Sequence, residues 1–550
     1  MPSLSTATIT RFRRLILAAL VALFCGRIAL TYRVFNDTFD EAGHIRGGLE
    51  ILQRGSYPLG DHHPPLGRLI LATPPYLAGL RLDHHGDLWG GGPWTRREPE
   101  FFWKTLLLAR AANLLFAGLL LFFVYRWASV LYGAPAGLAA GLLAICCPNL
   151  VAHASLATLD LPATATFLMA AYFLWRWSRQ PGWRYCLATA AAFALATLAK
   201  LGALFHVPLL GLMFFLLARR GRLRLTPAAL RTGLARGAAF AMLAGFLVWA
   251  GYLFNVDIIV PPGHRYISAF DMGGPDSPPN RLLKALGHRR LPAPGLAQGV
   301  IELLSHNQAG HRAYLLGRLA QHGWWYYFPA ALAVKTSLPL LVLTGIVLWL
   351  LARGRLAGAA RDSIFPLLAI LVTLAVGMAG NLNIGIRHVL PVYALLAILA
   401  SGVFAAADRF PARPRTLVAA ALGLMLWQAW ESAAAHPDYL AYFNQLGRGR
   451  EAQLLADSNL DWGQDLARLG DYVRQNRIDA MHLRYFGVSD PAKFGIPARE
   501  LPPHQPRRGW VAISVNYLLG LANDPAEYAW LKARRPAARV GKSIWVYYIP

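Results

Sequence analysis

Two adjacent carboxylates, Asp40 and Glu41, stand shortly after the first apolar run of the chain. Ionisable side chains are costly to place beside a membrane, and those found there usually serve a function. A carboxylate in this position can take the proton of an attacking hydroxyl group, a step typically worth ~10²–10⁴-fold in rate. Asp40 is therefore a candidate general base, and Glu41 a candidate catalytic neighbour. The structural alternative is that both acids only open a surface helix, where carboxylates interact favourably with exposed N–H groups.

A histidine pair, His62 and His63, follows in the same loop. With Asp40, Glu41 and His44, these residues offer the oxygen and nitrogen atoms that bind divalent metal cations. No closely spaced ligand motif such as HExxH accompanies them. A divalent cation is therefore one candidate for this loop, and a histidine pair hydrogen-bonded to the backbone is the other. His62 and His63 are also candidate substrate-binding residues.

Four further polar residues interrupt or border apolar runs: Asp160, Lys200, Arg387 and His388. A leaving phosphate needs cations or hydrogen-bond donors to hold its developing charge, and Arg matches phosphate oxygens with a planar fork. Lys200 is therefore a candidate phosphate-binding residue, and the family resemblance described below implies the same role for Arg387 and His388 and a catalytic role for Asp160. The structural alternatives are a helix N-cap for Asp160, snorkelling for Lys200 and a helix-end anchor for Arg387.

Aromatic side chains gather in the segment GWWYYFP at 323–329. Trp324 and Tyr327 are candidate substrate-binding residues, because aromatic faces can stack on sugar rings. The more ordinary interpretation is an aromatic belt at the membrane surface.

The densest acidic cluster outside the apolar runs is DSNLDWGQD, from Asp457 to Asp465. Asp457 and Asp461 are candidate substrate-binding residues, and packing of this segment over the site is the alternative. A calcium loop starting at Asp457 would place Trp462 where glycine is required and Arg468 where glutamate is required. The sequence therefore does not favour calcium.

The composition places these residues in an integral membrane protein. The chain has 550 residues, 56% of them hydrophobic and 15% charged, and its mean hydropathy is +0.37. Several apolar runs approach or exceed the ~20 residues that cross a bilayer as a helix. The predicted spans are 15–32, 105–131, 136–151, 161–177, 185–199, 202–217, 238–254, 326–351, 365–380, 389–407 and 416–430, with an interfacial helix over 66–80.

The distribution of positive charge predicts the orientation. The net charge is +26, but Arg residues cluster in short gaps on alternate sides of the spans, most densely at 219–236. That pattern follows the positive-inside rule and does not indicate nucleic-acid binding. We expect eleven crossings, an uncleaved N-terminal signal anchor, a cytoplasmic N-terminus and an outer C-terminus. The residues that then reach the same, outer face are Asp40, Glu41, His62, His63, Asp160, Lys200, the loop 255–322, Arg387 and His388.

A composition change near 433 predicts a second domain. Apolar runs shorten to strand length at 510–516 and 543–549, and a helix is predicted over 525–533. We expect a transmembrane domain at 1–432, with long outer loops at 33–104 and 255–325, and a small α/β domain at 433–550. The four cysteines lie within or beside apolar runs, so no disulfide framework is expected in the outer segments.

Several of these segments, in this order, resemble a family of glycosyltransferases. It comprises the bacterial lipid-carrier-dependent enzymes that are protein-O-mannosyltransferase-like or aminoarabinose-transferase-like and have the GT-C fold. The matching segments are Asp40–Glu41, His63–Leu66, Asp160–Pro162, Tyr314–Gly317, Gly323–Pro329 with Lys335, Ile384–His388, Tyr442–Asn444 and Asp457–Asp465.

The resemblance implies a mainly α, polytopic protein of about 11 transmembrane helices with the GT-C fold and a small C-terminal α/β extracytoplasmic domain. It implies inverting transfer of mannose or another hexose or pentose from a polyprenyl-phosphate donor. The acceptor would be a hydroxyl of a protein Ser/Thr, a lipid or an envelope glycan. The expected partners are this donor, this acceptor and membrane lipids, without nucleic acid, in a bacterial inner membrane with the C-terminal domain in the periplasm.

Two other classes of function remain as alternatives. A transporter or lipid flippase would use the charged loops as a gate, but the internal repeat typical of transporters is not evident in the sequence. An accessory scaffold would bind envelope glycans without catalysis, and the intact Asp40–Glu41 pair argues against it.

Overall fold

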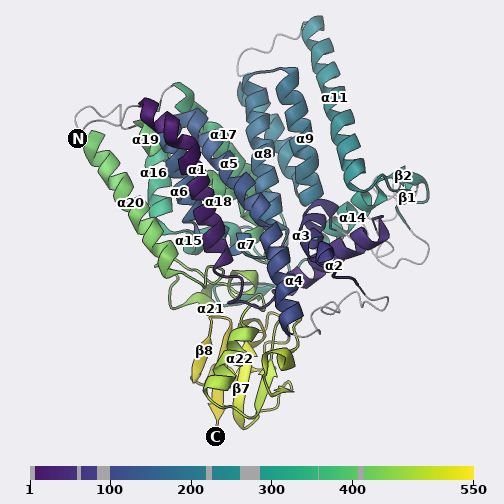
Figure 1. Cartoon of the computed structure of the whole chain (residues 1–550), viewed down its shortest axis with the longest axis vertical. Helices are drawn as coiled ribbons and strands as arrows, with labels where there is room; N and C mark the ends of the chain where they lie inside the picture. Colours follow the sequence, from purple (N-terminus) through teal and green to yellow (C-terminus); the bar gives the residue numbers. More distant parts are fainter. Residues whose placement is uncertain are drawn as a thin grey trace.

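The computed structural model describes residues 6–57, 63–82, 99–218, 226–260, 281, 285–356, 358–406 and 414–550. A body of long helices occupies one end of the molecule, and a small sheet domain that includes the C-terminus occupies the other (Figure 1). Short helices and loops lie between them. The first helix starts at the end of the helical body away from the sheet.

The helical body is built from apolar runs, because a helix pairs every internal backbone N–H and C=O with its own chain. Its helices are α1 (Thr6–Ala29), α4 (Pro99–Ala112), α5 (Leu114–Tyr132), α6 (Ala134–Ile145), α7 (Pro148–Ala154), α8 (Asp160–Arg179), α9 (Trp183–Ala199), α10 (Ala203–Ala218), α11 (Pro227–Gly251), α15 (Tyr327–Lys335), α16 (Leu338–Ala352), α17 (Ile364–Met378), α18 (Pro391–Ala400), α19 (Val403–Ala406) and α20 (Pro414–Ala434).

Among the described residues, four helical stretches are long and apolar enough to cross a membrane: Glu100–Tyr132, Pro227–Gly251, Arg361–Met378 and Arg415–Ala434. Two bent pairs would raise that number to six, and four shorter apolar helices accompany them. The chain is thus a mainly helical membrane protein. The count of eleven crossings stays a prediction.

Two predicted spans are wrong as continuous helices. The run 136–151 is divided into α6 and α7, which meet at 66°, and the run 326–351 into α15 and α16, which meet at 114°. Pro148 and Pro339 stand in the first turns of α7 and α16. Proline cannot donate a helical hydrogen bond and disfavours a helical residue before it, so each run ends and restarts there.

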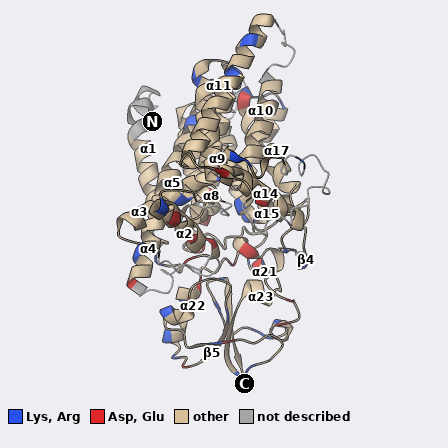
Figure 2. Cartoon of the chain, turned by 90° about the vertical axis from the view of Figure 1, so that its right-hand side faces the viewer, with Lys and Arg blue, Asp and Glu red and all other residues tan. Residues whose placement is uncertain are grey.

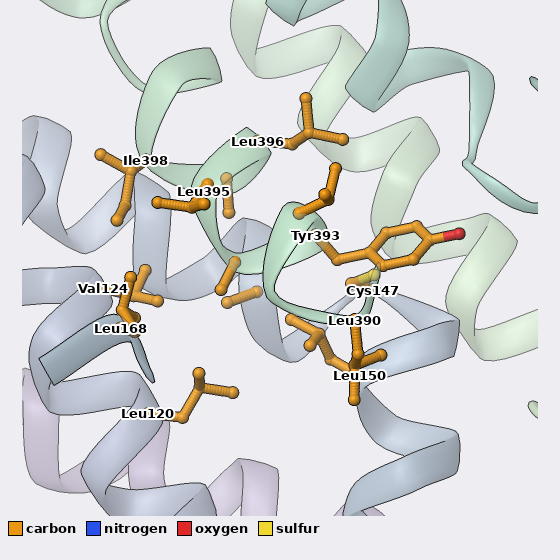
Figure 3. Packing of buried hydrophobic residues seen from close by; sticks show 14 of the residues in the cluster. Leu120, Val124, Cys147, Leu150, Leu168, Leu390, Tyr393, Leu395, Leu396 and Ile398 are labelled. Atoms are coloured by element: carbon orange, nitrogen blue, oxygen red, sulfur yellow. The ribbon is translucent and has the colours of Figure 1, made fainter. Parts of the chain in front are cut away.

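The centre of the helical body is α18. Every residue from Val392 to Ala400 is buried, as expected for a helix that is apolar on all sides. Figure 3 shows its side chains facing Leu120 and Val124 of α5, Leu168 of α8 and Leu150 of α7. α8, which begins at Asp160, therefore shares one packed core with α18, which follows the turn of Arg387 and His388.

The elements between the helices and the sheet come from the predicted outer loops. They are α2 (Phe39–Arg54), α3 (Pro65–Leu77), β1 (Val256–Ile258), β2 (Arg290–Pro292), α14 (Pro294–Ala309), β3 (Ala313–Leu315) and β4 (Arg318–Ala320). The helix predicted over 66–80 is confirmed as α3, and its position at the membrane interface stays a prediction. A capping box between Thr38 and Glu41 starts α2, and Gly55 ends it in the left-handed conformation with φ 64°.

The sheet domain has five strands in the order β6-β5-β7-β9-β8. Its strands and helices are α21 (Glu451–Leu454), α22 (Leu466–Gln475), β5 (Met481–Arg484), β6 (Ala498–Glu500), β7 (Gly509–Ser514), α23 (Val515–Leu518), α24 (Ala529–Lys532), β8 (Ala538–Val540) and β9 (Ile544–Ile549). β5 runs parallel to β6 and β7, whereas β9 is antiparallel to β7 and β8.

Both strands predicted in this domain are confirmed, as β7 and β9, but the predicted helix over 525–533 is too long. Only α24 forms there. The side chains of Asp524 and Glu527 accept hydrogen bonds from backbone N–H groups of Ala526 and Asp524. Such local bonds hold a turn in competition with a helix.

Candidate functional site

Asp40 lies in the first turn of α2, at the boundary between the helical body and the sheet domain. Its carboxylate forms an ion pair with Arg387, which belongs to a short 3₁₀ turn, Ile386–Val389, between α17 and α18. The Arg387 guanidinium also lies 4.3 Å from the ring centroid of Trp462 in the sheet domain. The Asp40 side chain is 26% exposed and that of Arg387 13%. The predicted base and the predicted phosphate-binding cation are therefore in contact and open to a ligand.

Arg387 and His388 each carry a buried nitrogen without a hydrogen-bond partner among the described residues, Nε of Arg387 and Nε2 of His388. Burial alone would lower the pKa of Arg387, but the nearby carboxylates of Asp40 and Asp160 raise it. Burial, reinforced by the positive charges of Lys200 and Arg387, holds the pKa of His388 well below its usual value. This turn thus presents a permanent cation and a neutral imidazole, both with unused capacity to bind a ligand.

Glu41 has a different environment from that of its neighbour. It is fully buried, and Arg110 of α4 donates to both carboxylate oxygens, with Nε–Oε1 and Nη2–Oε2 each 2.8 Å. The backbone N–H groups of Thr38 and Ala157 also donate to it at 2.8 and 2.7 Å, and the Thr38 hydroxyl donates at 3.2 Å. Glu41 therefore fixes the start of α2, which sets the position of Asp40.

Asp160 and Lys200 come from neighbouring helix ends and form a second ion pair. Lys200 Nζ lies 2.8 Å from Asp160 Oδ1, and His153 Nδ1 lies 3.7 Å from Asp160 Oδ2. Asp160 is buried, whereas the Lys200 side chain is 33% exposed. Leu159 occupies the N-cap position of α8 and Asp160 is the first residue of the helix, so the structure places Asp160 in contact with Lys200 and not at the N-cap predicted as the alternative.

His44 lies one turn further along α2, and His63 lies just before α3. The rings of His44 and His63 meet edge to face, with centroids 5.1 Å apart. His62 lies outside the described residues. Within the part of the chain that the structure describes, no three His, Cys, Asp or Glu side chains converge as metal ligands. The divalent cation stays a prediction that would need His62 or a ligand from the substrate.

Trp324 and Tyr327 each form a hydrogen bond to a segment that is distant in the sequence. The backbone N–H of Trp324 donates to Asn383 Oδ1 at 2.7 Å, and the buried Tyr327 hydroxyl accepts from Asn459 Nδ2 at 2.9 Å. Tyr327 thereby joins α15 to the acidic motif of the sheet domain. Trp324 remains partly exposed, so of the two its ring is the better placed for a substrate.

The acidic motif is bound to the loop that carries Arg387. Asn459 Oδ1 accepts from the N–H of Ile386 at 3.0 Å, and the Ser458 hydroxyl donates to Ile384 O at 2.5 Å. Gly385 has φ 138°, and a Cβ there would lie 2.2 Å from the Ser458 hydroxyl. Only glycine fits this close approach, which explains why glycine stands two residues before Arg387.

The two predicted acids of this motif differ in access. Asp457 is partly exposed, and burial, moderated by Arg387, raises its pKa to about 6. Asp461 is fully buried, and its two oxygens accept from the N–H groups of Gly463 and Asn516 at 3.2 and 3.1 Å. Asp457 thus faces the Asp40–Arg387 pair, whereas Asp461 supports the motif from within.

Burial raises the pKa of Asp461 from 3.8 to about 8. A carboxyl that is more easily protonated in the folded state stabilises the fold at low pH and loses that contribution as the pH rises toward its folded pKa. We therefore expect the thermal-unfolding midpoint of the full chain to fall between pH 6.5 and 8, and Asp461→Asn to reduce this fall. Asp457→Asn is the matched control, because the pKa of the Asp457 carboxyl in the wild type, about 6, lies below this pH range. If the unfolding midpoint of Asp461→Asn fell with pH as steeply as that of wild type, the raised pKa of Asp461 would not be the cause of the fall.

Lys335, at the end of α15, binds the acidic motif 457–465 to the helical body. It is fully buried, and Nζ donates to the backbone oxygens of Leu440 and Asn459, both at 2.7 Å. Lys335→Met would leave these acceptors unpaired, at a cost of about 1–3 kcal/mol each. We expect faster proteolysis of the sheet domain, whereas the exposed Lys532→Met should behave as wild type. Equal protease resistance of both variants would remove Lys335 from this role.

Several site residues were not singled out by role from the sequence: Arg110, His153, Lys335 and Trp462. Arg110 and Lys335 stand inside apolar runs, and an ionisable residue in such a run is by itself a reason to expect a function. His153 and Trp462 carry no comparable signal, because their partners are brought near only by the fold.

Comparisons with known proteins agree with this architecture. Residues 101–249 match the dolichyl-phosphate-mannose-protein mannosyltransferase family, a range that includes Arg110, Asp160 and Lys200. None of the curated proteins matches the sequence.

Among solved structures, the fold is similar to that of ArnT from Cupriavidus metallidurans bound to undecaprenyl phosphate. The two chains are 14% identical, the match covers 98% of each, and the TM-score is 0.50. The apo state of that ArnT matches at 14% identity over 98% of each chain with a TM-score of 0.47. The S. cerevisiae Pmt1–Pmt2 complex bound to the sugar donor matches at 20% identity, over 44% of this chain and 33% of that one, with a TM-score of 0.34. The resemblance predicted from the sequence is confirmed at this level: residues 101–249 match the mannosyltransferase family model, and the fold along the whole chain is similar to that of ArnT.

Proposed function

We propose that the chain transfers a sugar from a polyprenyl-phosphate donor to a hydroxyl acceptor, with inversion at the anomeric carbon. The observation that carries this proposal is the contact between Asp40 and Arg387, a partly exposed carboxylate and a guanidinium with an unused Nε. A carboxylate suits deprotonation of the acceptor, and an adjacent guanidinium suits the phosphate of the donor. The matched family's description and the carrier lipid in the ArnT structure support a lipid-phosphate donor.

In the proposed reaction the acceptor oxygen attacks the anomeric carbon of the donor. A new glycosidic bond forms, the bond from that carbon to the phosphate oxygen breaks, and its electron pair leaves with the polyprenyl phosphate. The acceptor proton passes to Asp40. Arg387 turns part of its guanidinium from Asp40 to the phosphate oxygens, which frees the carboxylate and stabilises the departing charge.

The other candidate residues have supporting roles in this scheme. Lys200, held by Asp160 at 2.8 Å, adds a second cation for the phosphate. Neutral His388 offers its buried Nε2 to the donor. Glu41 positions Asp40 through Arg110 without touching the reactants.

The location of the reaction is part of the proposal. The start of α1 and the sheet domain lie at opposite ends of the helical body (Figure 1). Basic residues mark the end of α11 far from the sheet, and acidic residues lie around α2 and α21, between the helices and the sheet (Figure 2). With positive charge inside, the sheet domain and the site face the outside of the membrane, which in a bacterium with an inner membrane is the periplasm.

The experiment is a transfer assay with the purified full chain in liposomes. Labelled undecaprenyl-phosphate sugars, hexoses and pentoses separately, are supplied with an envelope extract that contains proteins, lipids and glycans. Label in one acceptor fraction would support the proposal and identify both substrates. Movement of labelled lipid across the bilayer without transfer would replace it with the flippase alternative.

A further inference from the structure

A cavity of about 370 Å³ lies between the edge of the sheet and the segment that follows α20. In Figure 1 this is the region where β8 and α21 approach the lower end of α20. The residues that shape it are Arg448, Glu451, Leu460, Arg539, Lys542 and Trp545. Its volume is within the range of small-ligand sites, about 300–1,000 Å³.

The β8–β9 hairpin builds one wall. Arg539 and Trp545 are paired across the two strands, so their side chains stand on the same face. The Arg539 guanidinium lies 4.3 Å from the Trp545 ring centroid, and Lys542 occupies the turn between the strands. The antiparallel register thus brings Arg539 and Trp545 together, and the turn adds Lys542 to the same wall of the cavity.

The cavity has more positive than negative charge. Lys542 Nζ lies 3.4 Å from Glu451 Oε1, and Arg448 Nη2 lies 3.2 Å from Glu431 Oε2. Arg539 has no carboxylate partner among the described residues. Three cations, Arg448, Lys542 and Arg539, are therefore matched by only two carboxylates. Arg539 is the cation without a counter-charge in the described part of the chain, and its guanidinium packs on the Trp545 ring.

The cavity also lies beside the predicted membrane surface. Glu431, the partner of Arg448, is in the last turn of α20. Trp430 on the same turn is 71% exposed, and Leu446, two residues before Arg448, is 55% exposed. Exposed Trp and Leu next to Arg are typical of the level where lipid headgroups meet water.

We propose that this cavity binds a phosphate-bearing group, carried either by an anionic lipid headgroup or by a soluble sugar phosphate. Arg forks and a Lys ammonium suit phosphate oxygens, and the Trp545 and Leu460 side chains suit the carbon atoms attached to the phosphate. Neither Asp40 nor Arg387 is among the residues that line this cavity. Leu460 lines the cavity, while Ser458 and Asn459 of the same motif bind the loop that carries Arg387.

The test measures binding of two probes to the full-length chain in a neutral detergent. One probe is dioleoyl phosphatidylglycerol, followed by native mass spectrometry, and the other is glucose 1-phosphate, followed by calorimetry. The double variant Arg539→Gln/Lys542→Gln is compared with wild type. Arg534→Gln/Arg535→Gln is the matched control, because it removes the same charge from exposed positions of the same domain.

We expect at least one probe to bind the double variant about tenfold more weakly than wild type, with no change in the control. A loss confined to phosphatidylglycerol identifies a lipid headgroup, and a loss confined to glucose 1-phosphate identifies a soluble ligand. Equal affinity of the double variant and the control for both probes overturns the proposal, as does a wild type that binds neither. Transfer activity has no part in this readout, so its outcome is independent of the proposed reaction.

Discussion

Asp40→Asn is expected to lower the rate of sugar transfer by ~10²–10⁴-fold, the usual contribution of a general base. The substitution keeps the size of the side chain and its ability to accept a hydrogen bond from Arg387, but it removes the group that takes the acceptor proton. Arg387 keeps Asp160 and Asp457 as neighbouring charges, so the fold should be retained. The measurements are the transfer rate and the thermal-unfolding midpoint of the same preparation.

Asp438→Asn is the matched control for this change. Asp438 also pairs with an arginine, Arg468, at 2.6 Å, and its side chain is 25% exposed, close to the 26% of Asp40. We expect this variant to transfer sugar at the rate of wild type. If Asp40→Asn also kept the wild-type rate, Asp40 would be structural and the base would have to be sought elsewhere.

Glu41→Gln is expected to produce the largest loss of stability, about 3–5 kcal/mol, the cost of breaking a buried ion pair by removing one partner. Glu41 and Arg110 are 0% and 1% exposed. The variant would leave the Arg110 guanidinium buried without a counter-charge and would loosen the first turn of α2. The readout is a lower unfolding temperature and a smaller yield of monodisperse protein.

Glu50→Gln on the same helix separates this effect from a general loss of charge. Glu50 pairs with Arg54 at 2.8 Å, but the two side chains are 20% and 60% exposed, and such pairs contribute little. We expect this variant to unfold like wild type. If Glu41→Gln instead abolished transfer without any loss of stability, Glu41 would take part in the reaction itself, as first predicted from the sequence.

The sequence predicted a mainly helical membrane protein correctly, because apolar runs of sufficient length have few other stable forms in a bilayer. It failed at Pro148 and Pro339, where the prediction carried a helix through a residue that starts a new one. It also predicted that Asp40, Lys200 and Arg387 share one end of the helices. That placement depends only on counting spans and on charge bias, which are properties of the chain itself.

The ion-pair partners of Asp40 and Glu41 could not be predicted from the sequence. Arg387 and Asp40 are 347 positions apart, and Arg110 and Glu41 are 69 apart. Two adjacent acids, equivalent in the sequence, acquire different environments because only one of them points at a buried arginine. The structure thus divides the pair into an accessible carboxylate and a buried anchor.

The central claim is that Asp40 acts on the acceptor and Arg387 on the donor phosphate. The most direct test measures donor binding and transfer on the same samples of wild type, Asp40→Asn and Arg387→Gln in liposomes. The account predicts that Asp40→Asn binds labelled undecaprenyl-phosphate sugar as wild type does and does not transfer it, whereas Arg387→Gln binds it poorly. Wild-type transfer by Asp40→Asn, or undiminished donor binding by Arg387→Gln, would contradict this account.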